Sequence, residues 1–351
     1  MRFLRLIALS LGIGCTGASA RDGDDYVQPP PPPPRRVMAS TADTVRLAAV
    51  LDRAKDLPRL RSLIVQWKGE VLAERYYGGA TRATRANIKS ASKSIISALV
   101  GIAIAQGHIR GVDQPIAELL PEETRQLTPD KRAITVGDLL SMRAGLQSTS
   151  FDNYGRWVTS RNWVSFALRQ PMAAERGGAM VYSTGNTHLL SAILTRATKM
   201  STHRYAQRHL AGPLGFDLAA WERDPQGIYF GGNDMFLRPR DMLKIGTMYL
   251  AGGSYGGKQV LSRAWIDSSW VERTVSHWNG HRYGYGWWTR TAQQYDVKFA
   301  WGYGGQFIFL VPELHLVVVM TSNANVSRDG GHNWALHRML EDEIVPAFLA
   351  P

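Results

Sequence analysis

The chain is almost without cysteine, because Cys15 is the only one among its 351 residues. A single thiol cannot close a disulfide within the chain, so stability has to come from an ordinary hydrophobic core. If residues 1–20 are removed on export, no thiol remains, which excludes thiol catalysis and zinc held by cysteines. The remaining length, about 330 residues, is ample for such a core, as one large domain or two lobes.

A run of apolar residues long enough to span a membrane is missing at the N-terminus. The apolar stretch at residues 6–13 is too short, since a bilayer takes about 20 residues. It follows Arg2 and Arg5 and precedes the small residues 18–20, which is the arrangement of a cleaved signal peptide. We therefore expect an exported protein, periplasmic or secreted, without a transmembrane span after cleavage; a retained anchor is the alternative. The residues before Cys15 match a lipoprotein box poorly, which disfavours lipidation.

Clustered charge is also lacking. The formal net charge is +12, but no run of five or more Lys or Arg residues occurs. Scattered positive charge is typical of a solvated basic surface, here one that would face an anionic cell envelope. We expect no nucleic-acid partner.

Residues 21–44 are of low complexity and include six consecutive prolines, Pro29 to Pro34. Such a segment forms an extended spacer and buries nothing, so we interpret it as a disordered linker. No repeat is evident, and the folded domain is expected over residues 45–351.

The pattern beyond the linker predicts strands at both ends and helices between them. Strands at both ends indicate one antiparallel sheet, so we predict an α+β fold in which a mostly helical lobe interrupts the sheet. The α/β part would cover about residues 45–100 and 270–351, and the helical lobe about 101–269. The expected elements are a helix capped at 41–43 and running to about 56, a hairpin over 61–77 turning at 68–69, a buried helix over about 90–106, strands at 283–289, 295–300, 306–311 and 316–321, and a closing helix over about 333–349.

Ser90 and Lys93 form a Ser-x-x-Lys pattern at the start of the predicted buried helix. A serine needs a base to accept its proton, and a lysine three residues later lies on the same helix face. Burial behind an apolar helix would lower the lysine pKa enough for that role. At a helix start, the N–H of Ser90 is also free to face a developing oxyanion. The alternative is a helix cap with an exposed lysine.

Two further segments follow in order. Tyr182 lies in a Tyr-Ser-Thr stretch, and residues 299–308 hold a glycine-rich segment that begins a strand. Ser-x-x-Lys, Tyr-Ser and a glycine-rich strand in this order resemble the class C β-lactamase-related serine hydrolase superfamily. The Gly-Tyr-Gly-Gly-Gln-x-Ile stretch, and the segment at residues 134–142, are most similar to its 6-aminohexanoate-dimer hydrolase branch. The similarity covers about residues 45–345.

The resemblance implies a β-lactamase/penicillin-binding-protein-like fold and a role for each motif residue. Ser90 would be acylated, Lys93 would accept its proton, and Tyr182 would relay a proton to the leaving group. The backbone N–H groups of Ser90 and Tyr303 would form the oxyanion hole, and Gly302 and Trp301 would contact substrate. For Tyr182 the alternative is a core tyrosine whose hydroxyl is hydrogen-bonded. No cofactor or metal is implied.

The chain departs from penicillin-recognising relatives at two positions. Ala300 stands where they usually carry a cation that would pair with a substrate carboxylate, and Thr184 stands where many have asparagine. Both changes favour a small-molecule amide or ester as substrate. A β-lactamase or D,D-peptidase remains the first alternative, and a non-catalytic envelope-binding protein of the same fold is the second. Oligomeric state is not predicted.

Three other patterns are weaker. Residues 252–256 match Gly-x-Ser-x-Gly, but a helix precedes them and none follows, so we expect a helix-ending turn. His277 and His281 have metal-like spacing, but Asn-Gly between them breaks a helix, so we expect a surface loop. Trp287, Trp288 and Trp301 fit strand packing, with an apolar substrate cleft as the alternative.

Overall fold

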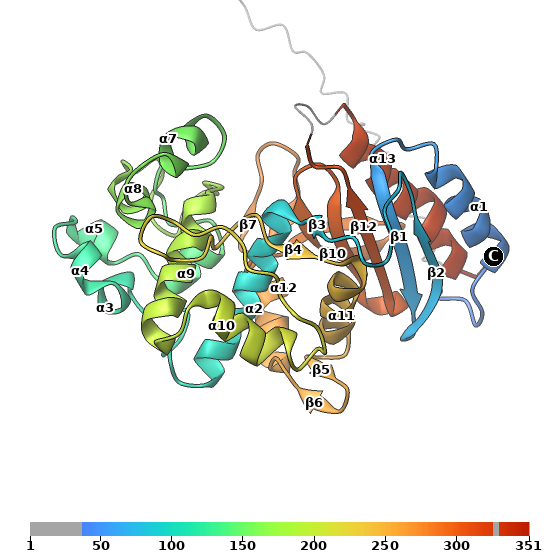
Figure 1. Cartoon of the computed structure of the whole chain (residues 1–351), viewed down its shortest axis with the longest axis horizontal. Helices are drawn as coiled ribbons and strands as arrows, with labels where there is room; N and C mark the ends of the chain where they lie inside the picture. Colours follow the sequence, from blue (N-terminus) through green and yellow to red (C-terminus); the bar gives the residue numbers. More distant parts are fainter. Residues whose placement is uncertain (1–36, 326–329, 351) are drawn as a thin grey trace, which may run out of the picture. The chain divides into compact units, whose positions relative to one another are not determined.

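The structure, a computed structural model, describes residues 37–325 and 330–350 (Figure 1). The predicted signal peptide and the linker up to residue 36 lie outside the described residues. The first helix begins close to the expected point, since Asp43 caps it by accepting a hydrogen bond from the N–H of Arg46 at 2.9 Å. None of the helices in the described ranges is both long and apolar enough to cross a bilayer.

One antiparallel sheet of eight strands unites the two ends of the chain, as the sequence predicts. The first hairpin turns at Lys68 and Gly69, both with positive φ (50° and 87°), as a tight two-residue hairpin turn requires. In spatial order the strands are β2 (Glu70–Tyr76), β1 (Leu60–Trp67), β12 (Leu316–Ser322), β11 (Gln306–Val311), β10 (Tyr295–Gly302), β9 (Trp288–Ala292), β8 (Arg282–Tyr283) and β7 (Thr274–Val275).

Both faces of the sheet are covered, which is why every residue of β11 and β12 is buried. Successive side chains of a strand point to opposite faces, so the two strands feed two separate cores. Phe307 and Phe309 pack with the first helix and the C-terminal helical segment, whereas Ile308 and Leu310 pack with the central helices.

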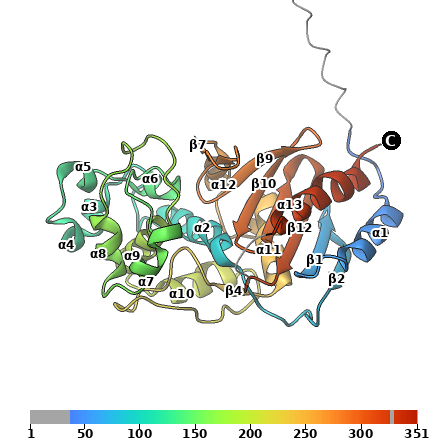
Figure 2. The ribbon, with the colours of Figure 1, turned by 90° about the horizontal axis from the view of Figure 1, so that it is seen from above.

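The helices fall into a layer on each sheet face and a helical group at the sheet's end, and Figure 2 shows the central α2 running between that group and the strands. The α-helices are α1 (Thr44–Ala54), α2 (Ser92–Ala105), α3 (Ile116–Leu119), α4 (Pro121–Thr124), α5 (Pro129–Arg132), α6 (Val136–Leu140), α7 (Tyr154–Val158), α8 (Trp163–Arg169), α9 (Thr184–Thr198), α10 (Thr202–Ala206), α11 (Pro239–Leu250), α12 (Arg263–Trp270) and α13 (His332–Arg338). Two short ladders, β3 (Ala86–Asn87) with β4 (Phe236–Leu237) and β5 (Ser254–Tyr255) with β6 (Lys258–Gln259), complete the elements.

The central helix α2 is buried along nearly its whole length, as predicted from its two apolar faces. Gly101 lets the indole of Trp265 on α12 approach closely, since a Cβ there would lie 2.4 Å from that ring. Helix α11 comes from the segment expected in the helical lobe but packs on the sheet, where a Cβ at Gly246 would lie 2.7 Å from Val317. One face of the sheet is thus covered partly by a helix from the middle of the chain.

Three expected elements differ in detail. The strand predicted over residues 283–289 is wrong, because Gly286 (φ 78°) reverses the chain and splits it into β8 and β9. The helix expected from Ser90 begins as a 3-10 turn, Lys89–Ala91, before α2. The closing helix changes character along its length, with α13 followed by a π-helical segment at Met339–Ile344 and a 3-10 turn at Val345–Phe348.

Candidate active site

Ser90 lies in the 3-10 turn that leads into α2, at the junction between the sheet and the helical group. The residue before it, Lys89, has φ 48°, a left-handed conformation that costs a side-chain-bearing residue about 1 kcal/mol. Asn87 and Asp234 hold this turn: the N–H of Lys89 donates to Asn87 Oδ1 at 3.0 Å, and the Lys89 ammonium pairs with Asp234 Oδ1 at 2.8 Å. Strain kept in place by such contacts is typical of functional sites.

Lys93 lies in the first turn of α2 and is only 2 % exposed. Its Nζ is 2.9 Å from Ser90 Oγ, 3.2 Å from Thr184 Oγ1 and 2.7 Å from the carbonyl oxygen of Gly232. Burial lowers the pKa of Lys93 to about 7, and the negative charge of Asp234 partly opposes this shift. An amine with this pKa is present in its neutral form, and able to accept a proton, near neutral pH.

Tyr182 lies directly before α9, with its ring close to Lys93 Nζ (5.1 Å to the centroid). Burial raises the pKa of the phenol to about 12, while a hydrogen bond with Ser90 lowers it. The hydroxyl therefore stays protonated at neutral pH. The structure thus brings together Ser90 and Lys93, at the start of α2, and Tyr182, in the segment that precedes α9.

A cleft with a volume of about 320 Å³ opens directly at Ser90. Tyr303 and Trp301, two of the predicted oxyanion and substrate-contacting residues, line it, whereas Gly302 does not. A Cβ at Gly302 would lie 2.0 Å from the carbonyl oxygen of Ile88, so glycine allows β10 to lie against the turn that carries Ser90. The lining consists of Ser90, Phe151, Tyr182, Trp278, Asn279, Trp288, Trp301 and Tyr303.

Sequence reasoning missed several of these residues. Trp278 and Asn279 lie in the loop between His277 and His281, which is indeed a surface loop but contributes to the cleft. Trp288 and Trp301 line the cleft, whereas Trp287 is fully buried beside Tyr249. Only the metal-like spacing of the two histidines drew attention to this loop.

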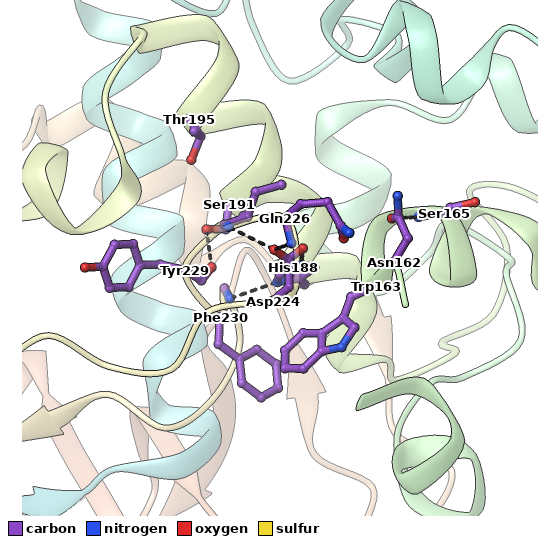
Figure 3. Close-up of polar contacts among 12 residues, drawn as sticks. Asn162, Trp163, Ser165, His188, Ser191, Thr195, Asp224, Gln226, Tyr229 and Phe230 are labelled. Atoms are coloured by element: carbon purple, nitrogen blue, oxygen red, sulfur yellow. Dashed lines mark hydrogen bonds and ion pairs between the residues drawn. The ribbon is translucent and has the colours of Figure 1, made fainter. Parts of the chain in front are cut away.

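The loop over residues 221–235 supplies Gly232 and Asp234 to the site. His188 fastens this loop through Asp224 (Figure 3). His188 Nε2 lies 3.0 Å from Asp224 Oδ2, and both side chains are completely buried. The N–H of Gly231 donates to His188 Nδ1 at 3.4 Å, so the ring carries its proton on Nε2 and donates to Asp224. The contact fixes the loop whose Gly232 carbonyl meets Lys93.

In the part of the chain that the structure describes, neither the Gly-x-Ser-x-Gly stretch nor a metal site belongs to the candidate site. Residues 252–256 end α11 and enter the β5–β6 hairpin, and Ser254 Oγ donates to Gln259 Oε1 at 2.7 Å. Within residues 37–325 and 330–350, no group of three or more His, Cys, Asp or Glu side chains is placed to hold a metal ion.

The geometry can be compared with known proteins. A model of the Beta-lactamase family matches residues 61–340. The chain belongs to the Beta-lactamase family. The match includes Ser90, Lys93, Tyr182 and Trp301 and extends over both parts of the fold. The family predicted from the order of the motifs is therefore confirmed.

Several known proteins are similar to this chain. A 6-aminohexanoate-dimer hydrolase of Paenarthrobacter ureafaciens is 27 % identical over 335 residues, which cover 87 % of this chain and 84 % of the relative. An octameric penicillin-binding protein homologue of Pyrococcus abyssi has a TM-score of 0.66 at 17 % identity, covering 86 % of this chain and 77 % of that one. EstCE1, a hydrolase with promiscuous acyltransferase activity, has a TM-score of 0.67 at 20 % identity, covering 86 % and 97 %. The β-lactamase/penicillin-binding-protein-like fold is thereby confirmed.

Proposed function

We propose that this protein is an exported serine hydrolase that cleaves a small-molecule amide or ester through an acyl-enzyme on Ser90. The observation that carries the proposal is the 2.9 Å contact between Ser90 Oγ and a lysine amine whose pKa is lowered to about 7. A neutral amine has two N–H donors and one lone pair. Gly232 and Thr184 are placed to accept from the two donors, which leaves the lone pair for the hydroxyl proton of Ser90.

In the acylation step, Lys93 accepts the Ser90 proton while Oγ bonds to the substrate carbonyl carbon. The backbone N–H groups of Ser90 and Tyr303 stabilise the resulting oxyanion. As the tetrahedral intermediate collapses, the bond to the leaving nitrogen or oxygen breaks, and Tyr182 passes a proton to that atom while it takes up the proton held by Lys93. Water then attacks the acyl carbonyl and gives its proton to Lys93, and that proton passes to Ser90 Oγ as the acid leaves. Trp301 contacts the acyl group from the cleft wall.

Relatives support this chemistry without fixing its substrate. The name of one relative includes a linear amide, the 6-aminohexanoate dimer, and EstCE1 is named a hydrolase. Ala300, which replaces the usual cation of penicillin-recognising relatives, is buried in the core. A β-lactam carboxylate would therefore lack a partner at this position, which favours amides or esters over β-lactams.

The test is fluorophosphonate labelling followed by turnover of a p-nitrophenyl ester, 6-aminohexanoate dimer and nitrocefin. We expect the protein to be labelled and to turn over the ester or the amide, with both activities lost in Ser90→Ala. Ser254→Ala is the matched control, because its serine lies in the misleading Gly-x-Ser-x-Gly stretch, and it should retain labelling. Labelling that persists in Ser90→Ala would show that Ser90 is not the nucleophile. Nitrocefin turnover well above that of the ester would favour a β-lactamase, and no labelling at all would favour a non-catalytic binding protein.

Export is the other part of the proposal, and it rests on the arrangement of residues 1–20. Expression of the full chain in a Gram-negative host should yield a periplasmic product whose mass matches a chain that starts at Arg21. A product that retains Met1 and fractionates with the membrane would instead indicate an uncleaved anchor.

A further inference from the structure

The cleft beside Ser90 is an aromatic enclosure. Five side chains, each from a different turn, loop or strand, touch in succession: Phe151 meets Trp278, Trp278 meets Tyr182, Tyr182 stacks on Trp288, and Trp288 meets Trp301. The ring centroids of these pairs are 5.4, 5.9, 5.8 and 5.6 Å apart. Contacts of this kind hold flat apolar surfaces in fixed positions and bring a large apolar area to a ligand.

Phe151 and Trp278 remain strongly exposed, at 64 % and 48 %, although each is a large apolar side chain. Tyr303, which also lines the cleft, is 43 % exposed. An exposed cluster of large aromatic groups around a cavity is the usual signature of a ligand-binding surface.

The exposure of Phe151 is built into the fold. Its φ of 54° is a strained left-handed conformation for a residue with a side chain. The residues on either side are fastened: the N–H of Thr184 donates to Ser150 Oγ at 2.9 Å, and Asn153 Nδ2 donates to the carbonyl oxygen of Ser148 at 2.9 Å. These bonds turn the phenyl ring out into the cleft, where it meets Trp278.

Charge is absent from the cleft wall. None of its lining side chains in the described ranges carries a formal charge; besides Ser90, the polar groups are Asn279, the hydroxyls of Tyr182 and Tyr303, and the indole N–H groups of the tryptophans. A charged acyl group would therefore lose its hydration without gaining an ionic partner.

The charged side chains of a neighbouring cavity already have partners. Asn279 and Trp301 separate the cleft from a second cavity of about 610 Å³, which Arg290, Arg338 and Glu341 line. Arg290 pairs with Glu341, and Arg338 pairs with Asp342 at 2.6 Å. A substrate carboxylate that reached this cavity would have to compete with both ion pairs.

We propose that the aromatic cleft selects substrates with an uncharged, apolar acyl group, and that Phe151 and Trp278 are its specificity-determining pair. This inference rests on the proposed function, because the cleft opens at Ser90. The acyl chain extends from the carbonyl bonded to Ser90 Oγ across the faces of Trp288 and Trp301 and ends against Phe151 and Trp278. A terminal carboxylate or ammonium at that end lies against apolar rings.

The test uses three p-nitrophenyl esters whose acyl chains share five methylenes and differ only at the end: heptanoate (methyl), pimelate (carboxylate) and 6-aminohexanoate (ammonium). We expect kcat/KM for heptanoate to exceed that for pimelate by about 30-fold or more, with 6-aminohexanoate between them because the rings can attract a cation. Ser90→Ala supplies the blank for each ester. Equal or faster turnover of pimelate would overturn the inference and would indicate that Arg290 binds the substrate carboxylate.

The variants locate the selectivity. Trp278→Ala and Phe151→Ala should each lower kcat/KM for heptanoate about tenfold more than that for p-nitrophenyl acetate, which is too short to reach them. Trp334→Ala is the matched control, a 67 % exposed tryptophan on α13, and should change neither value. An unchanged heptanoate-to-acetate ratio in both cleft variants would also overturn the inference. Acetate separates the two proposals: if Ser90 does not turn over even this ester, the proposed function itself fails, and the inference with it.

Discussion

Lys93 is the residue on which the proposed chemistry depends most, because its amine combines near-complete burial with three polar partners. Burial lowers its pKa to about 7, and the carboxylate of Asp234 limits the shift. Only the neutral amine can accept the proton of Ser90. Activity should therefore follow the titration of this single group.

We predict that kcat/KM for an ester rises with pH along one limb whose midpoint lies near 7. No fall should follow at moderately alkaline pH, because the pKa of Tyr182 is raised to about 12. Asp234→Asn removes a negative charge that favours the ammonium form, so the midpoint should move down by about half a unit to one unit. Asp296→Asn, at an exposed carboxylate paired with Lys298 and Arg282, is the control and should leave the midpoint in place. A midpoint that stays near 7 in Asp234→Asn would contradict this assignment.

A second prediction concerns stability at the same residue. The pKa of Lys93 lies at about 7 in the fold, well below the ordinary lysine value of 10.5, so the unfolded chain binds more protons between these values. The free energy of unfolding of the wild type, relative to Lys93→Met, should therefore rise by about 1.4 kcal/mol per pH unit from pH 7 to 10 and level off below 7. Urea unfolding of both proteins across this range measures the difference. A difference that does not change with pH would mean that the lysine remains charged in the folded protein.

At the residue scale, the sequence predicts the pair Ser90 and Lys93 because a spacing of three on a helix is a local property. Gly232 and Asp234 could not be found in this way. They reach Lys93 and Lys89 across 139 and 145 residues of sequence, through a loop without regular structure. Thr184 places its hydroxyl beside Lys93 from a distance of 91 residues in the sequence.

At the scale of elements, the loop over residues 221–235 matters as much as the helix that carries the nucleophile. Cβ atoms at Gly231 and Gly232 would lie 2.1 Å from atoms of Thr187, so the loop backbone lies directly against α9. His188 and Asp224 fasten it at the other end. Rigid placement of this loop keeps the Gly232 carbonyl within reach of Lys93.

Asp224→Asn should loosen this loop, because an amide N–H would then face the Nε2–H of His188. We expect a loss of about 2–4 kcal/mol in the free energy of unfolding. We also expect kcat to fall more than KM changes, since the loop contacts Lys93 and does not line the cleft. Asp267→Asn, in an exposed ion pair on α12, should cost less than about 1 kcal/mol and leave kcat unchanged. If Asp224→Asn loses stability but keeps its kcat, the loop has no positioning role.

An element can be predicted from the sequence when the residues that determine it are neighbours in the chain. The β1–β2 hairpin and β11 were predictable because both signals are local: short runs rich in β-branched and aromatic residues, and turn residues next to them. The split between β8 and β9 was not, because Gly286 turns where β8 folds back beside α2; a Cβ there would lie 2.9 Å from the carbonyl oxygen of Lys93. The wall of the cleft was not predictable either, since Phe151 and Trp278 meet only through the tertiary fold.

At the scale of the whole molecule, the candidate site is assembled from nearly the full length of the folded chain. The family match runs from residue 61 to 340, and the cleft draws side chains from residue 90 to residue 303. The Ser-x-x-Lys pattern alone therefore supplies no reactive serine. Fluorophosphonate labelling should disappear together with tertiary structure in a urea titration; labelling that outlasts the near-UV circular dichroism signal would show that the local pattern suffices.

The most direct measurement traps the acyl-enzyme formed from a substrate. A slowly deacylated p-nitrophenyl ester is mixed with the enzyme, the reaction is quenched with acid during turnover, and the modified peptide is mapped by tandem mass spectrometry. We predict one acyl group, attached to Ser90, with the unmodified peptide returning once substrate is exhausted. An acyl group on Ser254 or any other residue, or turnover with no covalent adduct on Ser90, would contradict the central claim.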